Sequence, residues 1–126
     1  MTVKVKVMSF GFSHGIPEEA SYLFDARILP NPYHVPELKQ LNGLDARVQA
    51  YVMDHPEPGA VLDAAEKLIM TVLSLHEQQG RALTVCFGCY GGHHRSVSIA
   101  ERLFARLTEK GIDAEIIHRD LEISDD

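Results

Sequence analysis

The sequence predicts a single α/β domain of three layers with a small, largely parallel sheet. Segments with the two-residue period of strands alternate with segments that have the 3.6-residue period of helices, and the gaps between them are short. At 126 residues, 45% of them hydrophobic, the chain has the size of one domain with one core. No internal repeat or low-complexity segment interrupts this alternation.

Four segments are predicted to be strands. Residues 3–10 begin with alternating valine and lysine, the pattern of a half-exposed strand. Residues 22–29 form a second strand, which must end where two prolines follow within three residues. Residues 82–89 are almost continuously apolar, as in a buried strand, and residues 114–118 form a short last strand.

Three further segments have helical character. Residues 60–79 carry apolar side chains three and four positions apart and are followed by Gly80, which suits a helix C-terminus. Residues 96–110 show the same pattern and are also followed by a glycine. Asp45 is a good N-cap for a shorter helix that ends at Met53. The alternation of these helices with the strands favours a parallel sheet.

The stretch richest in chemical groups is C-F-G-C-Y-G-G-H-H-R-S at residues 86–96, between the buried strand and the last helix. Its two glycines let the backbone approach a ligand, and the helix start leaves unpaired N–H groups with a partial positive charge. Arg95 adds a planar guanidinium suited to two phosphate oxygens, and Ser96 adds a hydroxyl. The predicted ligand-binding residues of this loop are Cys89, Tyr90, Gly91, Gly92, His93, His94, Arg95 and Ser96.

Neighbouring strands are expected to add to the same site, because ligands bind beyond the carboxyl ends of parallel strands. Ser9 and Gly11 lie at the end of the first strand. Asp25 and Arg27 share one face of the second strand, as their spacing of two requires. This pair either orients a sugar hydroxyl and a phosphate or pairs with other charges at this rim.

The loop also fits a second class of protein, the cysteine-dependent phosphatases. Cys89 and Arg95 have the C-x5-R-S spacing, in which a thiol at a helix N-terminus beside an arginine becomes a nucleophile. Cys89 and Arg95 would then be the catalytic residues. That mechanism also needs a histidine directly before the cysteine, where this chain has Gly88, and an aspartate as general acid.

A metal site is a third alternative, prompted by His14, Cys89, His93, His94 and His118. The adjacent His93 and His94 point in different directions, and no pair with the spacing of zinc ligands accompanies them on one element. We therefore predict neither a metal site nor a cofactor.

Composition limits the partners and the compartment. The net charge of −6 argues against general affinity for nucleic acid, which depends on lysine and arginine. No apolar run approaches the roughly 20 residues that span a bilayer, and the first residues lack the features of a secretory signal. We expect a cytoplasmic protein with no membrane partner and no disulfide between Cys86 and Cys89. Residues 121–126 are expected to form a flexible acidic tail.

The chain resembles one known family, the C-terminal domain of the RNase adapter RapZ, also met as YvcJ-type nucleotide-binding proteins. The matching stretches are S-F-G-F-S-H-G-I-P at residues 9–17, F-D-A-R-I-L-P-N-P-Y at 24–33, G-L-D at 43–45, G-C-Y-G-G-H-H-R-S-V at 88–97 and H-R-D-L at 118–121. They follow the order of the family over nearly the whole chain, so residues 1–126 are expected to form one such domain. Tyr90 stands where the family has threonine.

The resemblance implies an α/β domain similar to a phosphofructokinase subdomain. It implies a metabolite sensor rather than an enzyme, with glucosamine 6-phosphate or a similar sugar phosphate as ligand. It further implies a part in binding small regulatory RNA or a protein partner, and self-association through this domain. ATP binding is not carried over, because the chain contains no G-x-x-x-x-G-K-S/T motif.

Overall fold

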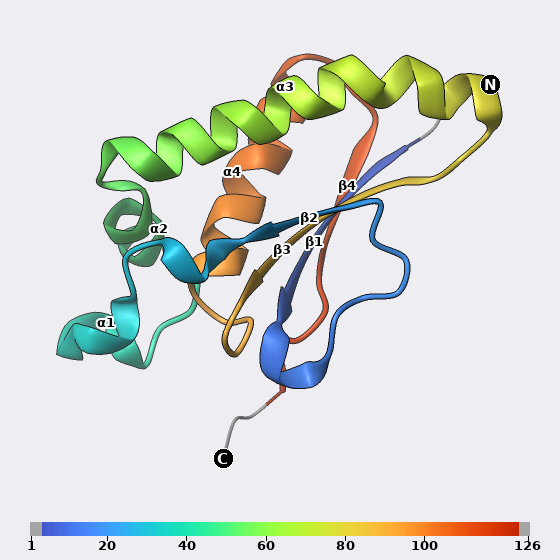
Figure 1. The fold of residues 1–126 in the computed structure, drawn as a ribbon. Helices are drawn as coiled ribbons and strands as arrows, with labels where there is room; N and C mark the ends of the chain where they lie inside the picture. Colours follow the sequence, from blue (N-terminus) through green and yellow to red (C-terminus); the bar gives the residue numbers. More distant parts are fainter. Residues whose placement is uncertain (1–3, 124–126) are drawn as a thin grey trace.

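The computed structural model describes residues 4–123 and shows an α/β fold built on a parallel sheet (Figure 1). The strands are β1 (Val5–Gly11), β2 (Tyr22–Asp25), β3 (Leu83–Cys89) and β4 (Ala114–His118), in the order β2-β3-β1-β4. Each neighbouring pair runs parallel, so the predicted fold class is confirmed. The carboxyl ends of all these strands therefore meet at one edge of the sheet.

The α-helices of the described chain are α1 (Pro36–Lys39), α2 (Ala46–Met53), α3 (Pro56–Gln79) and α4 (Arg95–Glu109). Helix α4 packs directly on β1, β3 and β4, and α2 and α3 pack on α4. Figure 1 shows α3 crossing α4. The connections from β2 to β3 and from β3 to β4 both advance in the same direction across the sheet, so right-handed crossovers put their helices on the same face.

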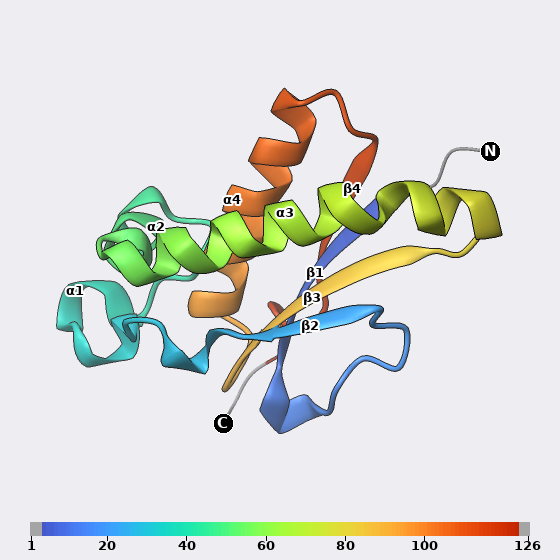
Figure 2. The same cartoon turned by 45° about the horizontal axis from the view of Figure 1, so that its top comes forward.

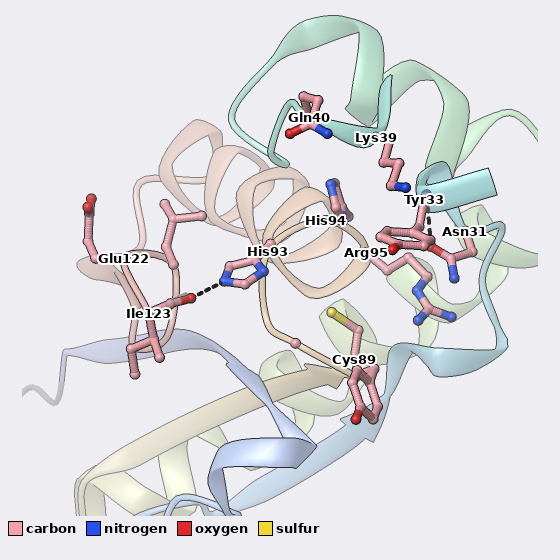
Figure 3. Close-up of a pocket in the computed structure, with 13 residues that line it drawn as sticks. Asn31, Tyr33, Lys39, Gln40, Cys89, His93, His94, Arg95, Glu122 and Ile123 are labelled. Carbon is pink, nitrogen blue, oxygen red and sulfur yellow. Dashed lines mark hydrogen bonds between the residues drawn. The ribbon is translucent and has the colours of Figure 1, made fainter. Parts of the chain in front are cut away.

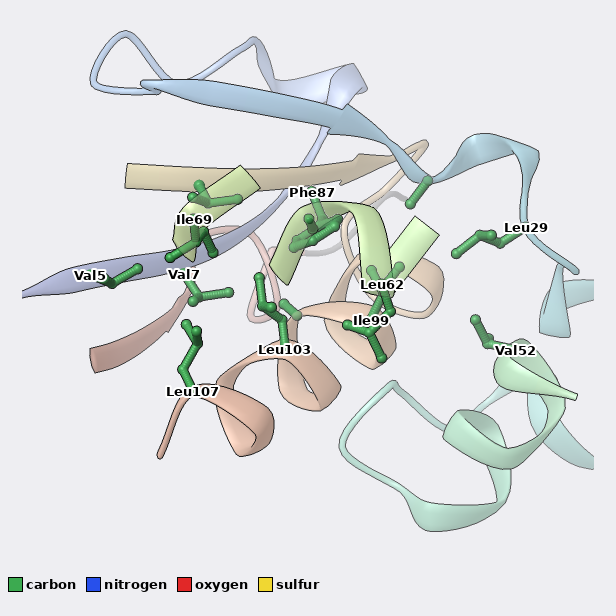
Figure 4. Close-up of a cluster of buried hydrophobic side chains, with 14 of the residues drawn as sticks. Val5, Val7, Leu29, Val52, Leu62, Ile69, Phe87, Ile99, Leu103 and Leu107 are labelled. Atoms are coloured by element: carbon green, nitrogen blue, oxygen red, sulfur yellow. The ribbon is translucent and has the colours of Figure 1, made fainter. Parts of the chain in front are cut away.

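Two apolar clusters fill the two faces of the sheet. On the helical face, Val7 and Phe87 pack with Leu103 of α4 and Ile69 of α3, all fully buried (Figure 4). On the other face, buried side chains of β1 and β3 are covered by Phe12 and Ala20 from the β1–β2 connection, which passes beneath the sheet in Figure 2. Helices, sheet and this connection form the three layers.

Most of the predicted boundaries agree with the structure. Asp45 caps α2 by accepting the backbone N–H of Arg47, and Gly80 ends α3 in the left-handed conformation, with φ of 62°. Strand β4 has the predicted bounds, and helix α4 begins and ends one residue earlier than predicted. Strand β1 ends at Gly11, one residue later than predicted, and residue 3 of the predicted strand lies outside the described residues.

Two predictions are wrong in part. The second strand ends at Asp25 rather than at residue 29, because the Asp25 carboxylate accepts the N–H of Arg27 and starts a 3-10 turn, η2 (Ala26–Ile28). Asp25 and Arg27 therefore do not share a strand face. Helix α3 begins at Pro56 rather than at residue 60, since prolines are tolerated in the first turn of a helix.

No helix within residues 4–123 is both long enough and apolar enough to cross a membrane.

Candidate functional site

A cavity of about 940 Å³ opens beside the start of α4, at the edge where the strands end (Figure 3). Its walls come from three parts of the chain: the β3–α4 loop, the segment from the 3-10 turn η3 (Pro32–His34) to α1, and the turn after β4. The lining residues are Asn31, Tyr33, Lys39, Gln40, Cys89, Tyr90, Gly91, His93, His94, Arg95, Leu121, Glu122 and Ile123.

The two glycines of the loop lie directly on the end of β1. Gly92 has φ of 82°, and a Cβ at this position would lie 2.7 Å from the backbone nitrogen of Gly11. A Cβ at Gly11 would in turn meet the backbone of Gly91. Glycine is thus required here both by the left-handed backbone and by the close approach of two chain segments.

The loop carries backbone donors that the described chain does not use. Among residues 4–123, no backbone carbonyl accepts the N–H groups of Gly91, Arg95 or Ser96. Arg95 and Ser96 belong to the first turn of the 15-residue helix α4, where N–H groups have no partner within the helix and carry a partial positive charge. The loop can therefore donate several hydrogen bonds to an anion.

Arg95 lies at the cavity with one of its N–H groups fixed. Its Nη1 donates to the backbone carbonyl of Arg27 at 2.7 Å. Lys39 adds a second positive charge to the lining, and its Nζ lies 4.5 Å from the centre of the Tyr33 ring. In Figure 3, Glu122 lies across the cavity from these cations, and it is the sole carboxylate among the lining residues. The cavity wall near Arg95 thus favours a negatively charged group.

The two histidines of the loop have different surroundings. Nε2 of His94 is buried without a hydrogen-bond partner in the described chain. Burial lowers the pKa of His94, and the backbone carbonyls of Leu41 and Lys39 act in the opposite direction. His93 donates from Nε2 to the carbonyl of Ile123 at 2.7 Å, which links the loop to the turn after β4. A buried polar atom without a partner, such as Nε2 of His94, is a place where a ligand or water can bind.

The cysteines differ in their access to the cavity. Cys89 lines it but is only 3% exposed, and its Sγ lies 3.1 Å from Oγ of the fully buried Ser96. Cys86 points into the opposite face of the sheet, where burial, together with the charge of Glu19, raises the pKa of its thiol to about 11. Tyr90, by contrast, is 66% exposed at the cavity.

Several predicted binding residues lie next to the cavity without lining it. Oγ of the buried Ser9 lies 2.7 Å from Nδ1 of His118, and the N–H of Gly11 donates to Oδ2 of Asp120 at 2.7 Å. Asp25 and Arg27 form a two-point ion pair. The predicted residues that the structure leaves out of the lining are Ser9, Gly11, Asp25, Arg27, Gly92 and Ser96.

A buried polar network lies behind the loop. His118 bridges Ser9 of β1 and Glu101 of α4, with 2.7 Å from its Nε2 to the Glu101 carboxylate. Asp120 is 1% exposed and accepts from Arg119 as well as from Gly11. Burial opposes ionisation of Asp120, but these two donors outweigh it and lower the pKa. The network joins residues about 109 positions apart and so has no local signal.

The lining residues outside the loop are also absent from the predicted set. Tyr33, Lys39 and Gln40 come from a segment that the sequence marks only by its prolines. Of the predicted tail, residues 121–123 form part of the cavity wall, and residues 124–126 lie outside the described residues. Within residues 4–123, no group of three or more His, Cys, Asp or Glu side chains is placed to hold a metal ion.

The sequence is similar to proteins of one family. Residues 3–122 match the family described as the RapZ C-terminal domain. A nucleotide-binding protein of Corynebacterium jeikeium is 46% identical over 122 residues, which cover 96% of this chain and 42% of that protein. A nucleotide-binding protein of Thermotoga sp. strain RQ2 is 44% identical over 119 residues, which cover 94% of this chain and 42% of that protein. A nucleotide-binding protein of Streptomyces coelicolor is 41% identical over 120 residues, which cover 94% of this chain and 40% of that protein.

The chain spans about two fifths of the length of these relatives. The matched range includes both the cavity-lining loop and the segment from η3 to α1. This chain therefore belongs to the RapZ C-terminal domain family.

Proposed function

We propose that this domain is a regulatory sensor that binds a phosphorylated small molecule of the aminosugar phosphate class, such as glucosamine 6-phosphate. The observation that carries the proposal is the position of Arg95 and the N-terminus of α4 at one cavity. A guanidinium next to unpaired helix N–H groups is suited to a phosphate dianion. The names of the relatives, nucleotide-binding proteins, agree with a ligand that carries phosphate.

In this proposal the phosphate accepts hydrogen bonds from the N–H groups of Gly91 and Arg95 and from the Arg95 guanidinium. The remainder of the ligand extends toward Asn31 and Gln40, whose side-chain amides both donate and accept. A cavity of about 940 Å³ is larger than phosphate needs and falls in the usual range for small-molecule sites.

Occupancy of the cavity would change an interface with a protein or RNA partner in the cytoplasm, in an assembly of several copies of the chain. The turn after β4 supports such an output, because residues 121–123 line the cavity and the carbonyl of Ile123 accepts a hydrogen bond from His93 of the loop. The net charge of −6 restricts any RNA contact to a local basic surface.

Thermal unfolding in the presence of a panel of sugar phosphates tests the proposal. A ligand that binds only the folded chain adds about 2.7 kcal/mol of stability at 100 times its Kd. Arg95→Ala should abolish the rise in Tm. The matched control is Arg47→Ala, at an exposed arginine that pairs with Asp45 and does not line the cavity. The proposal is wrong if no sugar phosphate raises the Tm, or if the rise is the same in Arg95→Ala.

A second candidate function is a cysteine-dependent phosphatase, favoured by the 3.1 Å contact between Cys89 Sγ and Ser96 Oγ. A hydroxyl at this distance can donate to a thiolate and so stabilise it as a leaving group. Turnover of p-nitrophenyl phosphate that Cys89→Ser abolishes would establish this activity. If the chain turns over no p-nitrophenyl phosphate anywhere between pH 5 and pH 8, the phosphatase function is excluded and the binding function remains.

A further inference from the structure

We propose that Asp25 is a positioning residue for phosphate binding: through the turn η2 it holds Arg95 at the cavity, and it does not contact the ligand. The inference rests on the proposed function, because it assigns Asp25 a role in that same site. It differs from the expectation that Asp25 orients a sugar hydroxyl.

The carboxylate of Asp25 fixes the backbone of Arg27. Its Oδ1 accepts from the backbone N–H of Arg27 and from Nε of the same residue, each at 2.9 Å. Its Oδ2 accepts from Nη2 of Arg27 at 2.8 Å. The first of these bonds caps η2, so one carboxylate determines both the conformation of the turn and the place of the Arg27 side chain.

The carbonyl of Arg27 in turn holds Arg95, which lies 68 positions later in the chain. Nη1 of Arg95 donates to this carbonyl at 2.7 Å. Ala26, inside the turn, is 2% exposed, and its carbonyl accepts the N–H of Leu29 at 3.2 Å, so the turn is anchored in the core on both sides of Arg27. The guanidinium of Arg95 is thereby held before a ligand arrives, which reduces the entropy lost on binding.

The side chains of Asp25 and Arg27 are exposed, but they bond to each other and not to the cavity. The Arg27 guanidinium is engaged with Asp25 and lies over the Phe12 ring, 3.9 Å from its centre. Neither residue lines the cavity. The hydrogen bond from Arg27 lowers the pKa of Asp25, and the positive charge of Arg95 contributes in the same direction. An ionised carboxylate next to a bound phosphate would repel the phosphate. A carboxylate that acts through the Arg27 turn instead holds Arg95 in place without contacting the phosphate.

Isothermal titration with inorganic phosphate tests the inference, because phosphate has no sugar hydroxyl to contact. Asp25→Ala should weaken phosphate binding about 2- to 10-fold, the cost of ordering one flexible side chain. Asp25→Asn, which keeps an acceptor for the turn, should weaken it less. In an Arg95→Lys background, where the contact with the Arg27 carbonyl is removed, Asp25→Ala should have no further effect.

The chain contains a matched control with the same three residues, Asp-Ala-Arg. Asp45 accepts from the backbone N–H, Nε and Nη2 of Arg47 just as Asp25 does from Arg27. It caps α2, however, and within residues 4–123 no hydrogen bond or ion pair joins the Asp45–Arg47 pair to Arg95. Asp45→Ala should leave the phosphate Kd unchanged. Circular dichroism and Tm of each variant show whether it is folded.

The outcomes separate the two proposals. Equal losses on Asp25→Ala in the wild-type and Arg95→Lys backgrounds, no loss, or tighter binding would each overturn the positioning role and leave the proposed function in place. A wild-type chain that binds neither inorganic phosphate nor any sugar phosphate would overturn both.

Discussion

Among single residues, His94 connects the stability of the fold to its binding site. The ring lines the cavity, is half-buried, and keeps one nitrogen without a partner among residues 4–123. Burial lowers its pKa, so the folded chain holds His94 in the neutral form at pH values where an unfolded histidine already binds a proton. A neutral ring can offer its free nitrogen to a ligand either as a donor or as an acceptor.

This residue makes the stability depend on pH. Between the lowered pKa and about 6.5, the unfolded chain binds more protons than the folded chain, so the free energy of unfolding falls as the pH falls through this window. Urea unfolding from pH 8 to pH 5 should show this loss, and His94→Gln should reduce its slope. The exposed His55 provides the control substitution, His55→Gln. Equal slopes in wild type and His94→Gln would contradict the assignment.

At the scale of elements, the end of α3 shows how one backbone conformation stops a helix. Gly80 has φ of 62°, its N–H donates to the Glu77 carbonyl at 3.2 Å, and the next N–H, of Arg81, donates to the His76 carbonyl at 2.9 Å. These bonds satisfy carbonyls that the helix leaves free at its end. The turn then directs the chain into β3, which leads to the binding loop.

Two glycine-to-alanine substitutions in this element should have opposite effects. Gly80→Ala places a Cβ in the left-handed region and should lower the free energy of unfolding by about 1–2 kcal/mol. Gly59→Ala lies inside α3, where an added Cβ meets nothing within 4 Å, and should raise it by about 0.5–1 kcal/mol. Urea unfolding of both variants measures the difference, and changes of the same sign would contradict this account of the helix end.

The elements that the sequence predicts correctly are those with local causes. Helix α4 has a strong apolar period, Asp45 is a favoured N-cap, and Gly80 follows the last apolar position of α3. The prediction is wrong where a side-chain hydrogen bond to the backbone competes with the strand. At Asp25 the side chain bonds to the backbone two residues on and ends the strand, although the residues beyond it have strand propensity.

The residues of the candidate site likewise fall into those that local sequence reveals and those that only the tertiary structure brings together. The loop from Cys89 to Arg95 is recognisable from glycine, histidine and arginine close together in sequence, and most of it lines the cavity. The other walls are brought there by the sheet and by packing between distant segments. No pattern of residue types marks Lys39 or Glu122 as lining residues, because tertiary structure alone brings them to the cavity.

At the scale of the whole molecule, α4 unites the core and the site. Its buried face packs on the sheet and against α2 and α3, while its N-terminus borders the cavity. Leu103 is fully buried at the middle of this face (Figure 4). The position of the binding loop therefore depends on the same packing that stabilises the fold.

A pair of identical substitutions tests the role of this helix in the core. Leu103→Ala should lower the free energy of unfolding by about 2–5 kcal/mol, because the side chain is buried and leaves a cavity. Leu75→Ala, on α3 at a side chain that is 51% exposed, should change it by about 0.5 kcal/mol or less. Comparable losses measured by urea unfolding in the two variants would show that α4 does not have this central position.

The most direct measurement is a titration of the 15N-labelled chain with glucosamine 6-phosphate and with inorganic phosphate, followed by amide NMR spectra. If the β3–α4 loop binds the phosphate, the amide signals of Gly91 and Arg95 should show the largest shifts with both ligands, and Arg95→Ala should abolish the shift of Gly91. Shifts confined to other parts of the chain, or none with either ligand at millimolar concentration, would contradict the account.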